Sequence, residues 1–284
     1  MKRIVLLSAI LACMLCVLRA SAQEDSLRAT RYVMRSTMIG AGKSNVFETY
    51  LSPVEYKGPE VRILHESMRM TRLMDGNVSV QNLVQASGSY TKNRSGTGEM
   101  YSGFFNWTCG LHYQFRINDD LKILFGPMLD LTVGGIYNVR NSNNPAQAKA
   151  YGSIDASGML VYKFRIARYP MVLRYQADLP VLGVMFSPEF GESYYEMFSL
   201  GHDGRHVAFT SFHNNPSLRQ MLTLDFPVRK VVMRVGYVCN IQQAKVNHLK
   251  SHVYSHDFMV GFVKNLYLLK GRRKVSMPNR VTPF

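Results

Sequence analysis

Histidine is the residue whose spacing in this sequence comes nearest to a pattern for metal chemistry. His248, His252 and His256 recur every fourth residue, and His202 and His206 have the same separation. On a helix this spacing would place imidazole ligands on one face. The surrounding sequence instead indicates loops and strand ends, and no carboxylate is positioned as a third ligand. We therefore interpret these histidines as rim or loop residues, and we expect no metal and no other cofactor.

Serine, histidine and aspartate together could also support hydrolysis, in which a base must lie within about 3 Å of the nucleophile. Sequence separation alone does not bring such a set together, and the local motifs of barrel lipases are missing. Hydrolysis of lipid or peptide by a barrel enzyme is therefore an alternative function, for which we name no catalytic residue. The candidate bases are His256-Asp257 and His202-Asp203, and the candidate nucleophiles are Ser199, Ser211 and Ser255.

The charge balance of the chain is strongly basic, and its distribution bears on the partner. The 284 residues include 34 Lys and Arg against 19 Asp and Glu, which gives a formal net charge of +15. These cations are dispersed along the chain, whereas nucleic-acid recognition needs a concentrated basic patch. We therefore expect no nucleic-acid partner. Basic rims would instead meet the phosphates of outer-membrane lipid and lipopolysaccharide.

The first 22 residues have the form of an export signal. Two basic residues precede the apolar run IVLLSAILACMLCVL, and Ala20-Ser21-Ala22 fits the small residues that signal peptidase accepts. A lipoprotein signal ending at Cys13 is the alternative, although its apolar core would be short. We expect cleavage after residue 22, a single domain over residues 23–284, and a basic C-terminal extension from about residue 270.

The mature sequence alternates between apolar and polar residues over long runs. In Tyr101–Asn118 the odd positions are aromatic, aliphatic, Gly or Cys, and the even positions include Ser, Asn, His, Gln and Arg. A period of two indicates a strand with one apolar and one polar face, and a helix cannot produce it. Similar runs cover 77–91, 121–140, 152–166, 169–179, 218–226 and 231–242, with weaker ones at 31–43, 61–73 and 257–266.

Two all-β architectures explain such alternation, and strand length separates them. Strands of a soluble β-sandwich are about 5–6 residues long, whereas membrane strands need roughly 9–11 residues in the hydrocarbon. Several runs exceed that length, which favours a closed antiparallel transmembrane β-barrel over an exported soluble β-protein that binds surface glycan. Because an open sheet edge is costly in lipid, the sheet must close, and we expect about 12 strands.

In a membrane barrel the apolar face touches lipid and the polar face lines the interior. The two cysteines of the mature chain, Cys109 and Cys239, lie on apolar faces, and we expect both to be free thiols. Charged residues occupy the polar faces, where Arg and Asp could pair across the lumen. The expected lumen-lining residues are Arg116, Lys163, Arg165, Arg174, Arg219, Asp225 and Arg234.

Four long stretches of the sequence resemble a known protein family. They are Phe47–Ile63, Leu179–Gly201, Asn214–Val228 and Arg234–Lys264, and the resemblance spans most of the mature chain. The chain is similar to a domain-of-unknown-function family, numbered 3316, of exported proteins from Bacteroides-type bacteria. This resemblance implies an outer-membrane location, and it supplies no catalytic residues.

The expected protein is thus an uncharacterised, porin-like barrel of the bacterial outer membrane, inserted there by the barrel-assembly machinery. It would act as a narrow pore or as a structural barrel, because long charged side chains crowd an interior of this size. If the pore conducts, the excess of Arg and Lys in the lumen predicts a preference for anions.

Overall fold

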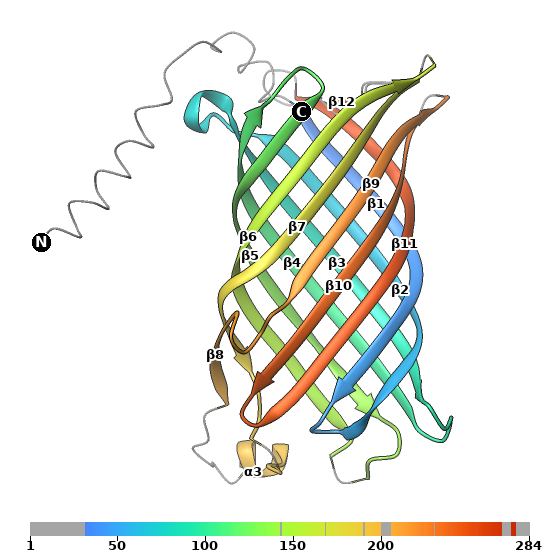
Figure 1. Ribbon diagram of the computed structural model, residues 1–284, viewed down its shortest axis with the longest axis vertical. Coiled ribbons are helices and arrows are strands. Elements are labelled where there is room, and N and C mark those ends of the chain that lie inside the picture. The colour runs from blue at the N-terminus through green and yellow to red at the C-terminus, as the bar shows by residue number, and fades with distance from the viewer. Residues whose placement is uncertain are drawn as a thin grey trace, which may run out of the picture.

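The computed structural model describes residues 32–142, 144–167, 169–189, 191–199, 206–229, 231–268 and 274–276. Within these residues the chain forms one antiparallel sheet that closes on itself (Figure 1). The export signal expected at residues 1–22 lies outside the described residues, and so does most of the basic extension expected from about residue 270.

Ten long strands make the barrel wall, and each pairs with the next in chain order. Pairing of the first strand with β11 completes the ring, from Tyr32 opposite Tyr267 to Glu48 opposite Ser251. The strands are β1 (Tyr32–Glu48), β2 (Ser52–Met70), β3 (Val78–Asn93), β4 (Glu99–Arg116), β5 (Leu121–Asn138), β6 (Ala146–Ile166), β7 (Tyr169–Phe186), β9 (Leu218–Val228), β10 (Val231–Val246) and β11 (Leu249–Leu268).

The expectation of about 12 strands is therefore too high by two. Two further short strands exist among the described residues, but neither belongs to the ring: β8 (Val207–Ser211) pairs with β7, and β12 (Lys274–Ser276) pairs with β11. The physical reason is strand length. Nine of the ten wall strands have 16 to 21 residues, so fewer strands use up the chain.

The alternation in sequence becomes an apolar outer wall and a filled interior. On β5, Phe125 is 56% exposed while the adjacent Leu124 is fully buried, and the same alternation continues along the strand. A strand places successive side chains on opposite faces, so the exposed set points away from the barrel axis. The barrel is of the outer-membrane type, with large aliphatic and aromatic side chains on its outside. The cysteines Cys109 and Cys239 are both free.

Aromatic side chains gather toward the two ends of the outer wall. Tyr90, Tyr101 and Tyr137 pair in register on three neighbouring strands at one end, and the Tyr90 and Tyr101 rings lie 5.1 Å apart. At the other end of β4, Tyr113 packs against Phe115 at 4.7 Å. The twelve residue steps from Tyr101 to Tyr113, at about 3.3 Å each and tilted by about 40°, span roughly 30 Å along the axis. That length matches the hydrocarbon thickness of a bilayer.

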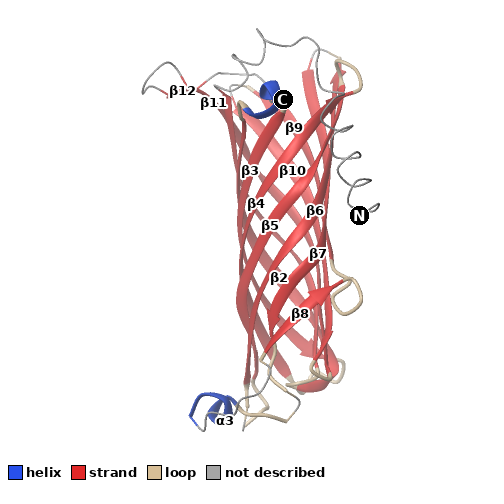
Figure 2. Cartoon of the chain, turned by 90° about the vertical axis from the view of Figure 1, so that its left-hand side faces the viewer, coloured by secondary structure: helices blue, strands red, loops and turns tan. Residues whose placement is uncertain are grey.

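The two ends of the barrel differ in their connections. At the end where β1 begins, the turns are short, and residues 229–230 alone join β9 to β10. At the opposite end the connection between β7 and β9 is long, and its described part contains α3 (Tyr194–Ser199) and β8 (Figure 2). A one-turn 3₁₀ helix, η1 (Leu73–Gly76), joins β2 to β3. Among the described residues, no helix has the length and apolar character needed to cross a membrane.

The outward direction of the apolar face predicts where a charge is tolerated. Leu129 lies at the middle of β5 and is 41% exposed on the outer wall. Arginine at the bilayer midplane costs about 2–4 kcal/mol, because its charge must reach water. We expect Leu129→Arg to lower the free energy of unfolding by about that amount, measured by urea unfolding of the protein in lipid vesicles.

The matched control is Val139→Arg, which adds the same side chain beyond the end of the strand. At the interface the cost of arginine falls to about 0–1 kcal/mol. Equal losses for the two variants would contradict a lipid-facing position for Leu129.

Candidate functional site

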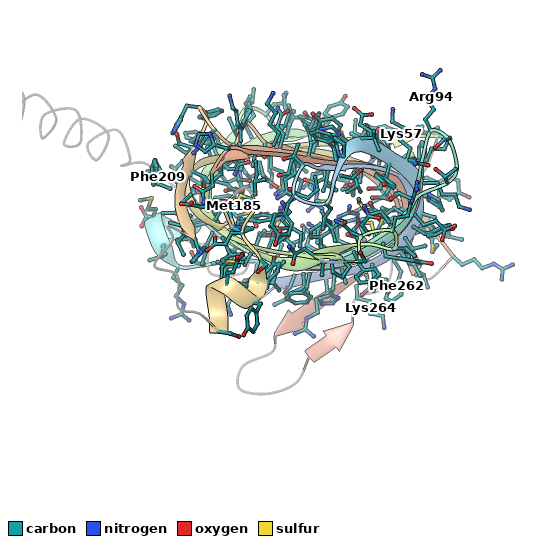
Figure 3. The ribbon with its side chains drawn as sticks, turned by 90° about the horizontal axis from the view of Figure 1, so that it is seen from below. Lys57, Arg94, Met185, Phe209, Phe262 and Lys264 are labelled. Atoms are coloured by element: carbon teal, nitrogen blue, oxygen red, sulfur yellow. The ribbon has the colours of Figure 1, made fainter. Side chains whose placement is uncertain are left out.

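The interior of the barrel contains several buried ion pairs, and Glu66 lies at the centre of one group of them. Glu66 is fully buried on β2, on the face of the strand opposite the apolar outer wall. Side chains project from the wall into the interior as well as outward (Figure 3). A buried carboxylate is stable only with charged or hydrogen-bonding partners.

Two arginines from strands that are not neighbours of β2 neutralise Glu66. Arg174 on β7 donates from Nη1 to Oε1 at 2.6 Å and from Nη2 to Oε2 at 2.7 Å. Arg234 on β10 donates to Oε2 at 2.7 Å, and its Nε and Nη2 bind both oxygens of Asp225 at 2.5 and 2.7 Å. Two guanidinium groups thus balance two carboxylates. Because β2 and β7 are not neighbours in the wall, the Arg174–Glu66 pair crosses the interior.

Uncharged polar side chains extend this network to further strands. Gln81 on β3 donates to Glu66 at 2.7 Å and exchanges hydrogen bonds with Gln176 on β7 at 2.9 and 3.1 Å. Ser157 donates to Asp178 at 2.6 Å and contacts Nε2 of His112 at 2.8 Å. The polar groups of β2, β3, β4, β6, β7, β9 and β10 are therefore joined across the lumen.

A second network lies nearer the end that carries α3, and Arg62 anchors it. Arg62 donates to Glu60 at 2.5 Å, to Asp257 at 2.7 Å and to Gln85 at 2.8 Å. Gln85 continues through Asn106 to Asp130, which pairs with Arg219 at 2.5 Å. Asp155 and Asp178 line the same small cavity as Arg219.

Apolar clusters lie on both sides of Glu66, while Asp178 on β7 joins the first network and borders the cavity of Arg219 in the second. One apolar layer contains Leu64, Met38 and Met221, and the other contains Met68, Met159 and Leu124. Two cavities among the interior side chains measure about 20 and 30 Å³, which is room for a water molecule or two. Along β2 the buried positions read Ser52, Tyr56, Glu60, Arg62, Leu64, Glu66, Met68 and Met70.

Contacts of the turn between β1 and β2 close the end that carries α3. The hydroxyl of Tyr50 donates to the backbone oxygen of Glu192 at 2.8 Å, and its ring packs edge-on against Tyr194 at 6.0 Å. Burial raises the pKa of Tyr50 to about 12, and the nearby Tyr194, Glu192 and Glu196 add to the rise. Burial also raises the pKa of Tyr194. Below this turn, Lys149 forms a buried ion pair with Glu48.

The expected lumen-lining residues divide into two groups. Arg174, Arg219, Asp225 and Arg234 take part in the buried networks. Arg116 and Arg165 are exposed and Lys163 is half-buried, at the end of the barrel where β1 begins. Sequence reasoning missed Glu66 and Arg62, because both faces of β2 are partly apolar there: Leu64 points inward and Ile63 outward.

The residues considered for hydrolysis do not form one site. His256 contacts the hydroxyl of Tyr237 at 2.7 Å, whereas the adjacent Asp257 is buried against Arg62 on the other face of β11. Ser255 accepts a hydrogen bond from Arg62 at 2.8 Å. Ser211 contacts Nδ1 of His213 at 2.5 Å on an exposed turn. Ser199, at the end of α3, is not part of any of these contacts, and His202 and Asp203 lie outside the described residues.

The histidines also differ from the expectation. His252 and His256 lie within β11 and not in a loop, and His252 is near the start of that strand. The backbone continues as a strand here because both residues pair along their length with β1 and β10. In the part of the chain that the structure describes, no three His, Cys, Asp or Glu side chains are arranged to hold a metal ion.

Comparison with known proteins gives one family and several distant barrels. The family model described as "Protein of unknown function (DUF3316)" matches residues 7–273. No curated protein matches the chain. Among solved structures, the outer membrane protease OmpT from Escherichia coli is 6% identical, with 84% of this chain and 97% of that chain covered and a TM-score of 0.44. The translocator domain of the autotransporter NalP from Neisseria meningitidis is 9% identical, with coverages of 92% and 95% and a TM-score of 0.39. Because both scores are below 0.5, the barrel assignment rests on the strand pairing of this chain itself.

The position of Glu66 between two arginines predicts a large effect of its neutralisation. Glu66→Gln keeps the size of the side chain but leaves Arg174 unpaired and Arg234 with Asp225 alone. Breaking a buried ion pair costs about 3–5 kcal/mol. We expect the free energy of unfolding to fall by that amount in urea titrations.

The control is Glu55→Gln on the same strand, where Glu55 pairs with Lys57 at 3.1 Å and both side chains are about half or more exposed. An exposed pair contributes about 0–1 kcal/mol. A similar small loss in Glu66→Gln would show that the interior is hydrated.

The raised pKa of Tyr50 predicts an alkaline weakening of the α3 contact. In the unfolded chain a tyrosine ionises near pH 10, whereas Tyr50 in the folded protein ionises near 12. Its contribution to stability is therefore complete below about pH 10 and is lost as the pH rises toward 12. We expect Tyr50→Phe to remove part of the fall in unfolding free energy across this window. The control is Tyr195→Phe, at an exposed tyrosine of α3, which should leave the fall in unfolding free energy unchanged.

Proposed function

We propose a role built on the barrel itself, because the chain belongs to DUF3316, a family of unknown function, and this membership assigns no activity. The protein is a closed barrel of the bacterial outer membrane that does not conduct. It acts as a rigid support for the segment between β7 and β9 at the cell surface.

Membrane insertion is supported by the outer wall. Large apolar side chains stay exposed around the barrel, and Phe258, Val61 and Phe125 are each more than half exposed. Such an area in water would be an aggregation liability, whereas acyl chains cover it at no cost. These exposed apolar side chains argue against the soluble β-sandwich considered above, because the apolar faces of a sandwich point inward.

A sealed lumen is supported by one observation above all, the contact of Glu66 with both Arg174 and Arg234. These charges satisfy one another across the interior, and apolar layers lie on both sides of them. An ion entering this space would have to break a buried ion pair and pass the apolar clusters on either side of it. The narrow anion pore therefore becomes the second candidate.

Surface display is supported by the difference between the two barrel ends. Outer-membrane barrels have short turns on the periplasmic side and longer loops outside. By this rule residues 187–217 face the exterior, where Val207, Phe209 and Tyr195 are each more than half exposed. Apolar residues at a surface often mark an interaction site.

The remaining parts of the proposal follow from the sequence. A signal peptide over residues 1–22 exports the chain, which is then inserted by the barrel-assembly machinery of a bacterium of the Bacteroidetes. Outer-membrane lipid and lipopolysaccharide surround the wall, and the cations Arg35, Arg69 and Lys264 meet lipid phosphates near the end where β1 begins.

The sealed lumen predicts the electrical behaviour of the purified protein. In planar bilayers we expect no single-channel steps, because neither of the measured interior cavities is large enough for a hydrated ion. Heat-modifiable migration on gels would show in the same sample that the barrel is folded.

Steady conductance of the wild-type protein would contradict the proposal. If that current prefers anions and the preference is lost in Arg219→Glu, the protein is instead the narrow anion pore. Surface display is tested separately with single cysteines on a background lacking Cys109 and Cys239. A membrane-impermeant maleimide should label Phe212→Cys on intact cells, and Met74→Cys only after permeabilisation.

A further inference from the structure

Three cations converge inside the end of the barrel where β1 begins. Arg116, Lys122 and Lys163 lie on the lumen side of the consecutive strands β4, β5 and β6. Arg116 is directly opposite Lys122 in the β4–β5 register. Lys122 pairs with Val161 in the β5–β6 register, and Lys163 is the next residue of β6 on the same face, so the three cations lie on adjacent strands at neighbouring positions.

These cations lack the carboxylate partners that the other interior charges have. Among the described residues, every ion pair involves other groups, and none includes Arg116, Lys122 or Lys163. Asp120 attracts Lys163 but forms no ion pair with it. Lys122 is nevertheless only 6% exposed. An ammonium group held out of water beside two like charges is unfavourable, and it keeps its charge only when an anion neutralises it.

A neighbouring amide independently indicates a missing acceptor. Gln114 lies on the same face of β4, one step further inside than Arg116, and is 5% exposed. Its Nε2 group is buried and has no hydrogen-bond partner. Buried amide donors are almost always paired. The buried atom without a partner here is thus a donor, and the charged side chains beside it are cations.

The two sides of the cluster differ, because its inner side contacts apolar residues and its outer side is exposed to water. The next inward residues below Lys122 and Lys163 are Leu124 and Val161, which belong to the buried apolar layer. Arg116 is exposed at the rim, so the opposite side meets water. The basic cluster thus lies between water at the rim and the buried apolar residues Leu124 and Val161.

We propose that Arg116, Lys122, Lys163 and the amide of Gln114 form a binding site for a phosphate group. A tetrahedral oxyanion with two negative charges has enough acceptors for four convergent donors, and Lys and Arg are the usual phosphate ligands of proteins. The phosphate belongs either to a free or solute phosphate or to the head group of a lipid. This site goes beyond the proposed support role and does not depend on it.

Titration of the full-length protein in non-ionic detergent with inorganic phosphate tests the site. We expect phosphate to raise the unfolding temperature above that in sodium chloride of equal ionic strength, because a ligand of the folded state stabilises it. Lys122→Gln should weaken phosphate binding about tenfold or more, since it removes a charge-assisted hydrogen bond. Without phosphate, Lys122→Gln should unfold at an equal or higher temperature, because a repulsive charge is gone.

The matched control is Arg94→Gln, which removes one positive charge from the turn between β3 and β4 at the opposite end (Figure 3). It should keep the wild-type response. If Lys122→Gln does not fold, Arg116→Gln at the exposed rim should show the same loss. Equal phosphate responses in wild type and the site variants, or no response in wild type, would overturn the proposal.

Reconstitution separates the two sources of phosphate. If the phosphate response seen in detergent disappears in vesicles of phosphatidylglycerol, a lipid head group occupies the site. If the response persists there, the ligand is a free or solute phosphate.

Discussion

The need to pair every backbone N–H and C=O group within lipid governs this structure. An unpaired group in hydrocarbon costs several kcal/mol, so a sheet in a membrane has to close. Pairing of β1 with β11 along seventeen residue pairs meets that need. Where β9 stops pairing with β7 at Asp178, β8 takes over from Leu182. The closed ring in turn fixes which face of each strand looks inward.

Closure creates an interior that must be filled, and the chain fills it with alternating kinds of layer. Arginines and carboxylates are acceptable there only as complete sets, because one missing partner leaves a buried charge. Glu66 with Arg174 and Arg234, and Arg62 with Glu60 and Asp257, are such sets. Methionine is frequent between them, and its flexible side chain suits the irregular gaps of a narrow lumen.

The period of two in the sequence was enough to predict the barrel and most of its strands. The run expected at 121–140 is β5, and the one expected at 231–242 is most of β10. Prediction was poorer where the outer face is polar. Only 257–266 of β11 was expected, because His252 and His256 on its outer side resemble loop residues.

The composition of the interior could be predicted only in part. A charged residue on the polar face of a strand indicates the lumen, as for Arg174 and Arg234. Its partner Glu66 is 108 and 168 residues away in sequence, and no local pattern connects them. The basic cluster could not be predicted for the same reason. Gln114, Lys122 and Lys163 are distant in sequence and come together only because β4, β5 and β6 are adjacent strands.

The joining of β1 to β11 has a consequence for how the molecule is made. Residues near 40 need partners near 259, so the ring cannot be finished by a growing chain whose last strand is still unmade. Contacts between residues so far apart in sequence form slowly, and until they form the unpaired strand edges are prone to aggregation. The ring can therefore close only after the whole chain has been made, and until then the edges of the sheet remain unpaired.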